Sequence, residues 1–141
     1  MSTKTTIVLL AIASLIVFSP HRMDAEPLHI QEATIEQHIQ RIFGDKSKVA
    51  TAVLKHESGF NLNAKGWNCR YGGKSKACKK EDRYRAWSVD CGIAQVNVKG
   101  QVCPSELMTL SGNMAQVEKI YKTQGLNAWV SYKTGAYKKY L

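Results

Sequence analysis

The sequence places one carboxyl group on the apolar side of a predicted helix. Residues 48–58 read K-V-A-T-A-V-L-K-H-E-S, and at 3.6 residues per turn one face collects Val49, Ala50, Val53, Leu54 and Glu57. Burial disfavours the charged form of a carboxyl group and raises its pKa, which suits a general acid working near neutral pH. Glu57 is therefore a candidate general acid. The alternative is that the helix end bends outward and leaves this side chain in water.

Two predicted helices position this residue. The opposite face of the central helix carries the polar residues Lys48, Thr51, Lys55 and Ser58. Gly59 follows as a stop signal. Upstream, residues 33–43 show helical spacing with Thr34 as a cap, and Asp45 or Ser47 is expected to cap the central helix. The two helices are predicted to pack as a hairpin.

The segment from Gly59 to Asp90 lacks helical periodicity and is rich in Gly, Lys and Arg. This composition predicts loops, with room for a short hairpin. Basic side chains in such a segment usually form a solvated face. They can also meet a substrate, and the sequence leaves both readings open.

Helix is predicted again in the last third of the chain. Residues 91–98 are expected to form a short helical turn capped by Ser88 or Asp90. A second short helix is expected to start at Pro104, and a longer one to run from Asn113 to Gln124. The tail carries the aromatic residues Trp129, Tyr132, Tyr137 and Tyr140. We expect the tryptophan in the core, and leave Tyr132 open between packing and contact with a sugar ring.

Composition and the start of the chain bear on where the protein works. At 141 residues the chain fits one domain. Residues 1–25 combine Lys4, an apolar run and the small residue Ala25, which predicts a signal peptide and a domain over residues 26–141. A signal peptide predicts an exported protein, periplasmic or extracellular. The alternative is that the segment stays as an uncleaved anchor.

Charge and cysteine content fit an exported protein. The formal net charge of +9 suits an acidic polymer or an anionic surface, and export argues against nucleic acid. Cysteines lie at Cys69, Cys78, Cys91 and Cys103. An even number in an exported chain predicts disulfides, with three connectivities available. We favour Cys69–Cys78 and Cys91–Cys103, because each closes a loop-rich segment. The spacing argues against a zinc site, and no metal or organic cofactor is indicated.

Two segments resemble the soluble lytic transglycosylase type of the lysozyme superfamily. In that family a helix ends in Glu-Ser, and a later segment reads Gly-x-x-Gln, a branched residue and Asn. The matching residues here are Glu57, Ser58, Gly92, Gln95, Val96 and Asn97. An Asn-initiated helix at Asn113 and a Trp-then-Tyr stretch near the end extend the likeness, which covers residues 43–141.

The resemblance implies a mainly α (α+β) fold, a lysozyme-like helical domain with a small loop or β insertion. It also implies a groove for peptidoglycan glycan strands and cleavage of the β-1,4 bond between N-acetylmuramic acid and N-acetylglucosamine. Glu57 would protonate the glycosidic oxygen. In a transglycosylase the same residue then acts as a base, while the sugar's 6-hydroxyl closes a 1,6-anhydro ring.

A hydrolase of this family needs a second carboxylate, and Asp90 is the candidate. The pattern Ser-x-Asp-x-Gly-x-x-Gln-x-Asn, which ends at Asn97, resembles the segment that carries the second acid in animal-type lysozymes. The alternative for Asp90 is a helix cap or an ion-pair partner. Gln95 and Asn97 have donors and acceptors for acetamido or hydroxyl groups, and the alternative is that they pin loops. Ser58 and Tyr132 are the further candidates for substrate binding.

One segment departs from the family pattern. Transglycosylases often carry Ala-Tyr-Asn-Ala-Gly near the end, whereas this chain has Ser131, Tyr132, Lys133, Thr134 and Gly135. The change bears on substrate contacts and on the choice between the two chemistries.

Three classes of function compete. The first is a monomeric peptidoglycan-cleaving enzyme, serving wall remodelling or a secretion or conjugation machine. The second is a glycan-binding module on the same fold that has lost catalysis, which the presence of Glu57 argues against. The third is a cationic antimicrobial protein acting on membranes, and the mixed charge of the predicted helices disfavours it.

Overall fold

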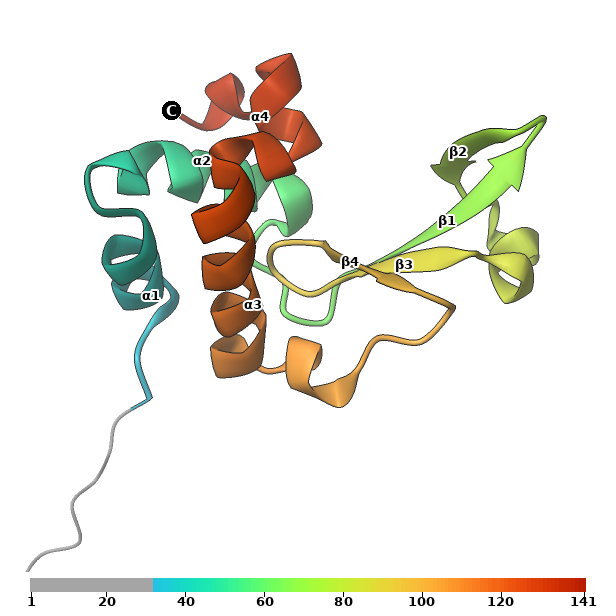
Figure 1. Cartoon of the computed structure of the whole chain (residues 1–141), viewed down its shortest axis with the longest axis horizontal. Helices are drawn as coiled ribbons and strands as arrows, with labels where there is room; N and C mark the ends of the chain where they lie inside the picture. The colour runs from blue at the N-terminus through green and yellow to red at the C-terminus, as the bar shows by residue number, and fades with distance from the viewer. Residues whose placement is uncertain (1–31) are drawn as a thin grey trace, which may run out of the picture. The chain divides into compact units, whose positions relative to one another are not determined.

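A computed structural model describes residues 32–141. The predicted signal peptide, residues 1–25, and the first residues of the predicted domain lie outside this range. The described part has a mixed α+β fold (Figure 1). Its helices are α1 (Ile35–Phe43), α2 (Ser47–Ser58), α3 (Leu110–Gln124) and α4 (Val130–Thr134). Its strands are β1 (Lys65–Tyr71), β2 (Lys74–Ala77), β3 (Ser88–Cys91) and β4 (Val96–Lys99).

The helices α1 and α2 follow the sequence prediction except at one cap. Thr34 caps α1 in a capping box with Gln37. The predicted cap of α2 by Asp45 or Ser47 is wrong. A 3₁₀ turn, Gly44–Lys46, runs directly into α2, and Ser47 already has helical backbone angles (φ −55°, ψ −41°). A capping residue needs a non-helical conformation, so neither side chain is placed to cap.

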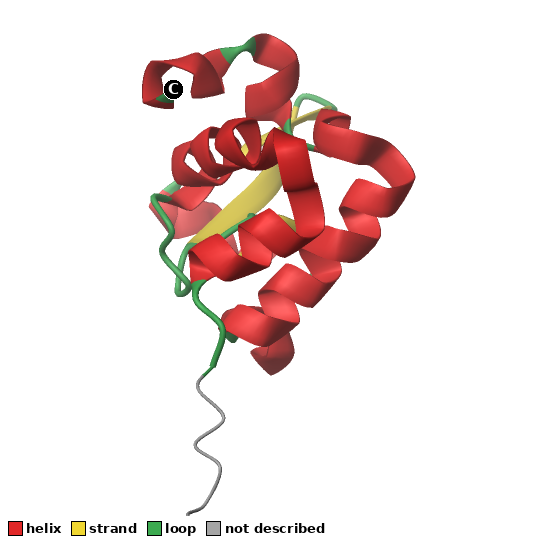
Figure 2. Cartoon of the chain, turned by 90° about the vertical axis from the view of Figure 1, so that its left-hand side faces the viewer, coloured by secondary structure: helices red, strands yellow, loops and turns green. Residues whose placement is uncertain are grey.

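The apolar face of α2 forms the centre of the core. Ala50, Val53 and Leu54 are fully buried, while Val49 is only half-buried. Met114 and Val117 of α3 belong to the same cluster. This packing fixes the rotation of α2, and therefore the direction in which its last turn points. Figure 2 shows the helices gathered on the side turned toward the viewer, with a strand of the sheet behind them.

The four strands form one antiparallel sheet in the order β2-β1-β3-β4. The segment from Gly59 to Asp90 was predicted as loops with room for a short hairpin. It contains such a hairpin, β1 and β2, which Figure 1 shows extending away from the helices, and also the start of β3. The predicted helical turn at 91–98 is wrong. Instead, β3 and β4 pair across a turn. Alternate residues of these strands face the core, and a four-residue strand is too short for this period to stand out in the sequence.

Both favoured disulfides are confirmed. Cys69 is bonded to Cys78, and Cys91 to Cys103. The first joins β1 to the segment after β2, and the second joins the end of β3 to the loop after β4. Two disulfides indicate an oxidising, exported environment. Within residues 32–141, no helix has the length and apolar character needed to cross a membrane.

The last third of the chain begins with the expected short helix, a 3₁₀ turn at Ser105–Met108. Helix α3 begins at Leu110 rather than at the predicted Asn113, because Thr109 caps it by accepting a hydrogen bond from the Gly112 N–H. Gly112 permits this early start, since a Cβ there would lie 2.1 Å from the Glu106 carbonyl oxygen. The helix ends at Gln124 as predicted, with Gly125 as its C-cap.

Candidate functional site

Glu57 lies in the last turn of α2, half-buried and held by a partner from the end of the chain. The hydroxyl of Ser131, a buried residue of α4, donates a hydrogen bond to Glu57 Oε1 at 2.5 Å. The helix does not fray, because Gly59 takes the left-handed conformation and its N–H bonds the Lys55 carbonyl at 2.9 Å. The carboxyl group therefore has a fixed position instead of a free one in water.

The neighbouring Ser58 attaches this helix end to the sheet. Its hydroxyl donates a hydrogen bond of 2.7 Å to the carbonyl of Ile93, in the turn between β3 and β4. Ser58 is half-buried, although the other polar residues of its predicted helix face, Lys48, Thr51 and Lys55, are exposed. The predicted role in substrate binding stays a prediction. In the structure this hydroxyl sets the distance between α2 and the turn.

The turn between β3 and β4 presents Gln95. The Gln95 backbone has a φ of +50°, an uncommon conformation for a residue with a side chain. Its side-chain Nε2 donates to the Gly92 carbonyl at 2.9 Å, which folds the amide back over the turn. The other end of the amide lies against β1. A Cβ added at Gly66 would be 3.0 Å from Gln95 Oε1.

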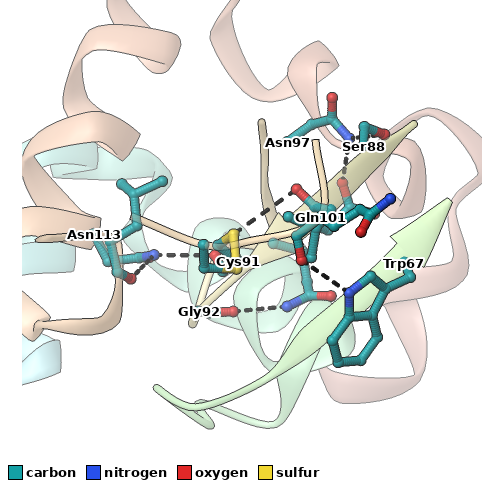
Figure 3. The surroundings of a disulfide bond; sticks show 12 residues. Trp67, Ser88, Cys91, Gly92, Asn97, Gln101 and Asn113 are labelled. Atoms are coloured by element: carbon teal, nitrogen blue, oxygen red, sulfur yellow. Dashed lines mark hydrogen bonds between the residues drawn. A yellow bond between two sulfur atoms is a disulfide. The ribbon is translucent and has the colours of Figure 1, made fainter. Parts of the chain in front are cut away.

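A buried amide supports this turn from below. Asn113 is fully buried in α3, and its Nδ2 donates to the carbonyls of Cys91 at 3.1 Å and Leu107 at 2.9 Å (Figure 3). Its Oδ1 accepts from the Ala94 N–H at 3.2 Å. Gly92 leaves the space that this requires, because a Cβ there would lie 2.3 Å from Asn113 Nδ2. The turn is thus fixed from α3 and from α2.

Asp90 lies on β3, half-buried between two side-chain amides. Its Oδ2 accepts from Asn68 of β1 at 2.9 Å, and its Oδ1 from Asn97 of β4 at 2.7 Å. The same amide nitrogens also donate to Ser88 Oγ. The alternative of a helix cap for Asp90 is wrong, since the residue belongs to a strand. Among the described residues it also has no ion-pair partner within 4.0 Å.

A cavity of about 330 Å³ opens beside the turn. It is lined by Ala94, Gln95, Val96 and Asn97 of the turn and β4, by Gln116, Ile120 and Gln124 of α3, and by Ala128 and Trp129. Of the predicted site residues in the described part of the chain, only Gln95 and Asn97 contribute to this lining. Trp129 is buried as expected, and its indole N–H donates to the Ala94 carbonyl at 3.0 Å.

Tyr132 follows Ser131 on α4 and is half-buried. Its ring stacks on that of Tyr137, with centroids 5.4 Å apart and planes at 25°. The ring is therefore packed on one side. Its assignment to substrate binding stays a prediction.

Sequence reasoning missed three parts of the site. In the sequence, Ser131 stands out only as a departure from a family pattern, and Asn68 belongs to no motif. The helix residues of the cavity wall, such as Gln116 and Ile120, carried no motif. All of these act across large sequence separations, 74 residues in the case of Ser131 and Glu57.

No group of three or more His, Cys, Asp or Glu side chains within residues 32–141 could hold a metal ion. Comparisons of this chain with protein-family models, with curated proteins and with solved structures return no match.

Proposed function

We propose that this protein cleaves the glycan strands of peptidoglycan, with Glu57 as the general acid and a lytic transglycosylase outcome. The proposal takes the fold as lysozyme-like. The observation that carries it is the fixed Glu57 carboxyl group: Ser131 holds its Oε1 at 2.5 Å, and Ser58 attaches the same helix end to the turn that carries Gln95. The predicted acid, Glu57, and its neighbour Ser58 thereby connect the end of α2 to the turn that carries Gln95, the predicted sugar contact.

The cavity supports an acetamido sugar as the ligand. Its wall has apolar side chains from Val96, Ile120 and Trp129, against which a methyl group or a sugar ring can pack. Gln95 and Asn97 also line the cavity, and residues of this type have the donors and acceptors that pair with the N–H and C=O of an acetamido group. Ligand pockets combine apolar walls with a few polar groups in this way.

The proposed reaction has two steps. Glu57 gives its proton to the glycosidic oxygen, the bond from this oxygen to the muramic acid C1 breaks, and an oxocarbenium-like centre forms at that carbon. The Glu57 carboxylate then takes the proton from the 6-hydroxyl of the same sugar, whose oxygen bonds to C1. The products are a 1,6-anhydro end and a free 4-hydroxyl, and Glu57 regains its proton. Ser131 keeps the carboxyl group in one orientation through both steps.

Replacing Glu57 with Gln tests the proposal. The amide keeps the shape of the side chain but cannot transfer this proton, so release of soluble fragments from purified peptidoglycan should fall at least about 100-fold. The exposed Glu36 provides the matched control, because Glu36→Gln makes the same change in the first turn of α1. Release of fragments by E57Q at the level of E36Q, with both proteins folded, would remove Glu57 from the reaction. Absence of release by the folded wild-type protein as well would leave the glycan-binding module as the better account.

A lysozyme-type hydrolase is the second candidate. It is favoured by the fixed Asp90 carboxylate, which accepts from Asn68 and from the cavity residue Asn97. In such an enzyme Asp90 stabilises or attacks the cation, and water completes the reaction. Mass spectrometry of the released fragments separates the two outcomes, since anhydro ends indicate a transglycosylase and reducing ends a hydrolase. Asp90→Asn should abolish the formation of reducing ends if the second candidate holds.

A further inference from the structure

The surface that carries Asp90 and Asn97 continues along the sheet beyond them. Paired residues of neighbouring strands share a face, as do alternate residues of one strand. The register pairs Gly66 with Asp90, Asp90 with Asn97, Asn68 with Ser88, and Ser88 with Lys99. Arg70 is the next residue of β1 on this side. We call these residues together the polar sheet face: Gly66, Asn68, Arg70, Ser88, Asp90, Asn97 and Lys99.

The far end of the polar sheet face carries a cation on an aromatic ring. The guanidinium carbon of Arg70 lies 5.1 Å from the centroid of the Trp87 ring, and the indole is 38% exposed. Arg70 has no carboxylate within 4.0 Å in the described part of the chain. Lys99 adds a second positive charge on the same face. This end therefore attracts an anion that the protein itself does not supply.

The strands around this pair are fixed. Trp87 donates its backbone N–H to the Asn68 carbonyl at 3.0 Å, and its own carbonyl accepts from Gly100 at 2.9 Å. At the hairpin, the Tyr71 hydroxyl donates to Asp82 Oδ2 at 2.5 Å. That hydrogen bond raises the pKa of the Tyr71 phenol, because it favours the protonated form beside a carboxylate. We call Arg70 and Trp87 together the platform. Because its strands are fixed in this way, the platform loses little entropy when a ligand binds.

The composition of the platform selects a ligand that has both a flat body and a carboxylate. A guanidinium group has a planar fork of donors that matches a carboxylate, and its edge stays available when its face lies on an indole. A neutral sugar polymer would use the ring of Trp87 but leave the charge of Arg70 unused. In a peptidoglycan strand, carboxylates come from the acidic stem peptide on each muramyl residue.

We infer that Arg70 and Trp87 form a binding subsite for the stem-peptide carboxylates of the glycan strand, at the opposite end of the polar sheet face from the cavity. The inference rests on the proposed function and narrows its substrate to strands that still carry peptides. Arg70 selects the carboxylate, and Trp87 packs against the sugar or peptide that bears it.

The chain provides a matched control for this subsite. Arg83 lies over the ring of Trp67, with its guanidinium carbon 4.6 Å from the centroid. Trp67 pairs with Val89 in the register, so it lies on the opposite face of the sheet. Arg83→Gln therefore removes the same charge and the same type of contact from the other side.

The test is a titration of the full chain with each probe, in which calorimetry measures the binding affinity. The probes are a muramyl disaccharide that carries its stem peptide with free carboxylates, the same disaccharide without peptide, and polyglycerol phosphate. R70Q should weaken binding of the peptide-bearing disaccharide about tenfold, as expected for the loss of one charge-assisted hydrogen bond. Binding of the peptide-free disaccharide should stay unchanged, and R83Q should match the wild type with both disaccharides. R70K, which keeps the charge but lacks the planar fork, should lie between wild type and R70Q.

Three results would overturn the subsite. The first is an equal loss of affinity for the peptide-bearing disaccharide in R70Q and R83Q, and the second is an equal loss of affinity for both disaccharides in R70Q. The third is Arg70-dependent binding of polyglycerol phosphate that is tighter than binding of the peptide-bearing disaccharide. Cleavage is measured separately with the E57Q pair. Binding that depends on Arg70 in a protein that releases no wall fragments would refute the enzyme alone. Cleavage with an unchanged affinity in R70Q would refute the subsite alone.

Discussion

At the scale of single residues, the position of Glu57 depends on a partner that its own helix does not supply. The period of 3.6 predicts that this side chain leaves α2 on the apolar side, and Val53 and Leu54 on that side are indeed buried. What the period cannot predict is the hydroxyl of Ser131, which reaches Glu57 from α4. A contact between residues so far apart in the chain depends on tertiary packing, and nothing in a local pattern encodes it.

Replacing Ser131 with Ala should lower kcat on peptidoglycan about tenfold, because the hydrogen bond that orients the Glu57 carboxyl group is lost and Glu57 samples several orientations. KM should change little, since Ser131 has no contact with substrate in the proposed reaction. The exposed Ser111 serves as control, as Ser111→Ala makes the same change on the surface of α3. A larger effect on KM than on kcat, or an unfolded S131A protein, would show that Ser131 acts through the fold instead.

At the scale of the elements, the helices could be predicted and the second hairpin could not. Helix α1 has a capping box and α2 a glycine stop, and both signals are local. Strands β3 and β4 have four residues each, and residues 91–98, which include the turn between them, were predicted as a helical turn. The turn between them is held by a tertiary contact, because the amide of Asn113 in α3 bonds Ala94 and Cys91.

Asn113→Ala should destabilise the protein by at least about 2 kcal/mol, because it leaves buried backbone groups of Cys91, Ala94 and Leu107 without a partner. The free energy of unfolding in urea measures the loss. Asn127→Ala is the control, since Asn127 is exposed in the 3₁₀ turn after α3. Similar urea midpoints of unfolding for the two variants would mean that water replaces the Asn113 amide without loss of stability.

At the scale of the whole molecule, charge is distributed unevenly. Residues 65–99 contain nine Lys and Arg against three Asp and Glu, a net charge of +6 within the formal +9 of the chain. This segment holds the sheet, including the platform of Arg70 and Trp87. Composition alone could predict the excess of positive charge. It could not predict which cations share a face with Asp90, because that depends on strand register.

One ion-pair network connects two helices that are far apart in the sequence, α1 and α3. Glu118 of α3 contacts Lys122 of the same helix and Arg41 of α1, each at 2.8 Å. Hydrogen bonds from Lys122 and Arg41 lower the pKa of Glu118 below its ordinary value. A lowered pKa in the folded state adds stability above the unfolded pKa, and this stability is lost as the pH falls through the folded value.

We therefore expect Glu118→Gln to melt at a slightly lower temperature than the wild type at neutral pH, a small effect because the pair lies near the surface. The difference should vanish in acid, once the carboxyl group is protonated in both folded and unfolded protein. Thermal melts across that pH range measure it, with Glu106→Gln as the control for loss of an exposed carboxylate. A difference in melting temperature that grows in acid would contradict stabilisation by the ionised Glu118 carboxylate.

The Cys91–Cys103 bond has a consequence for the cell that makes the protein. It fastens the strand end next to the turn that carries Gln95, and Cys69–Cys78 fastens the hairpin next to Arg70. In the reducing cytosol neither link persists, so a newly made chain would lack the covalent support of its working surface. For the proposed enzyme, both links form only after the chain has left the compartment of its synthesis, which gives the producing cell a delay before digestion of the wall begins.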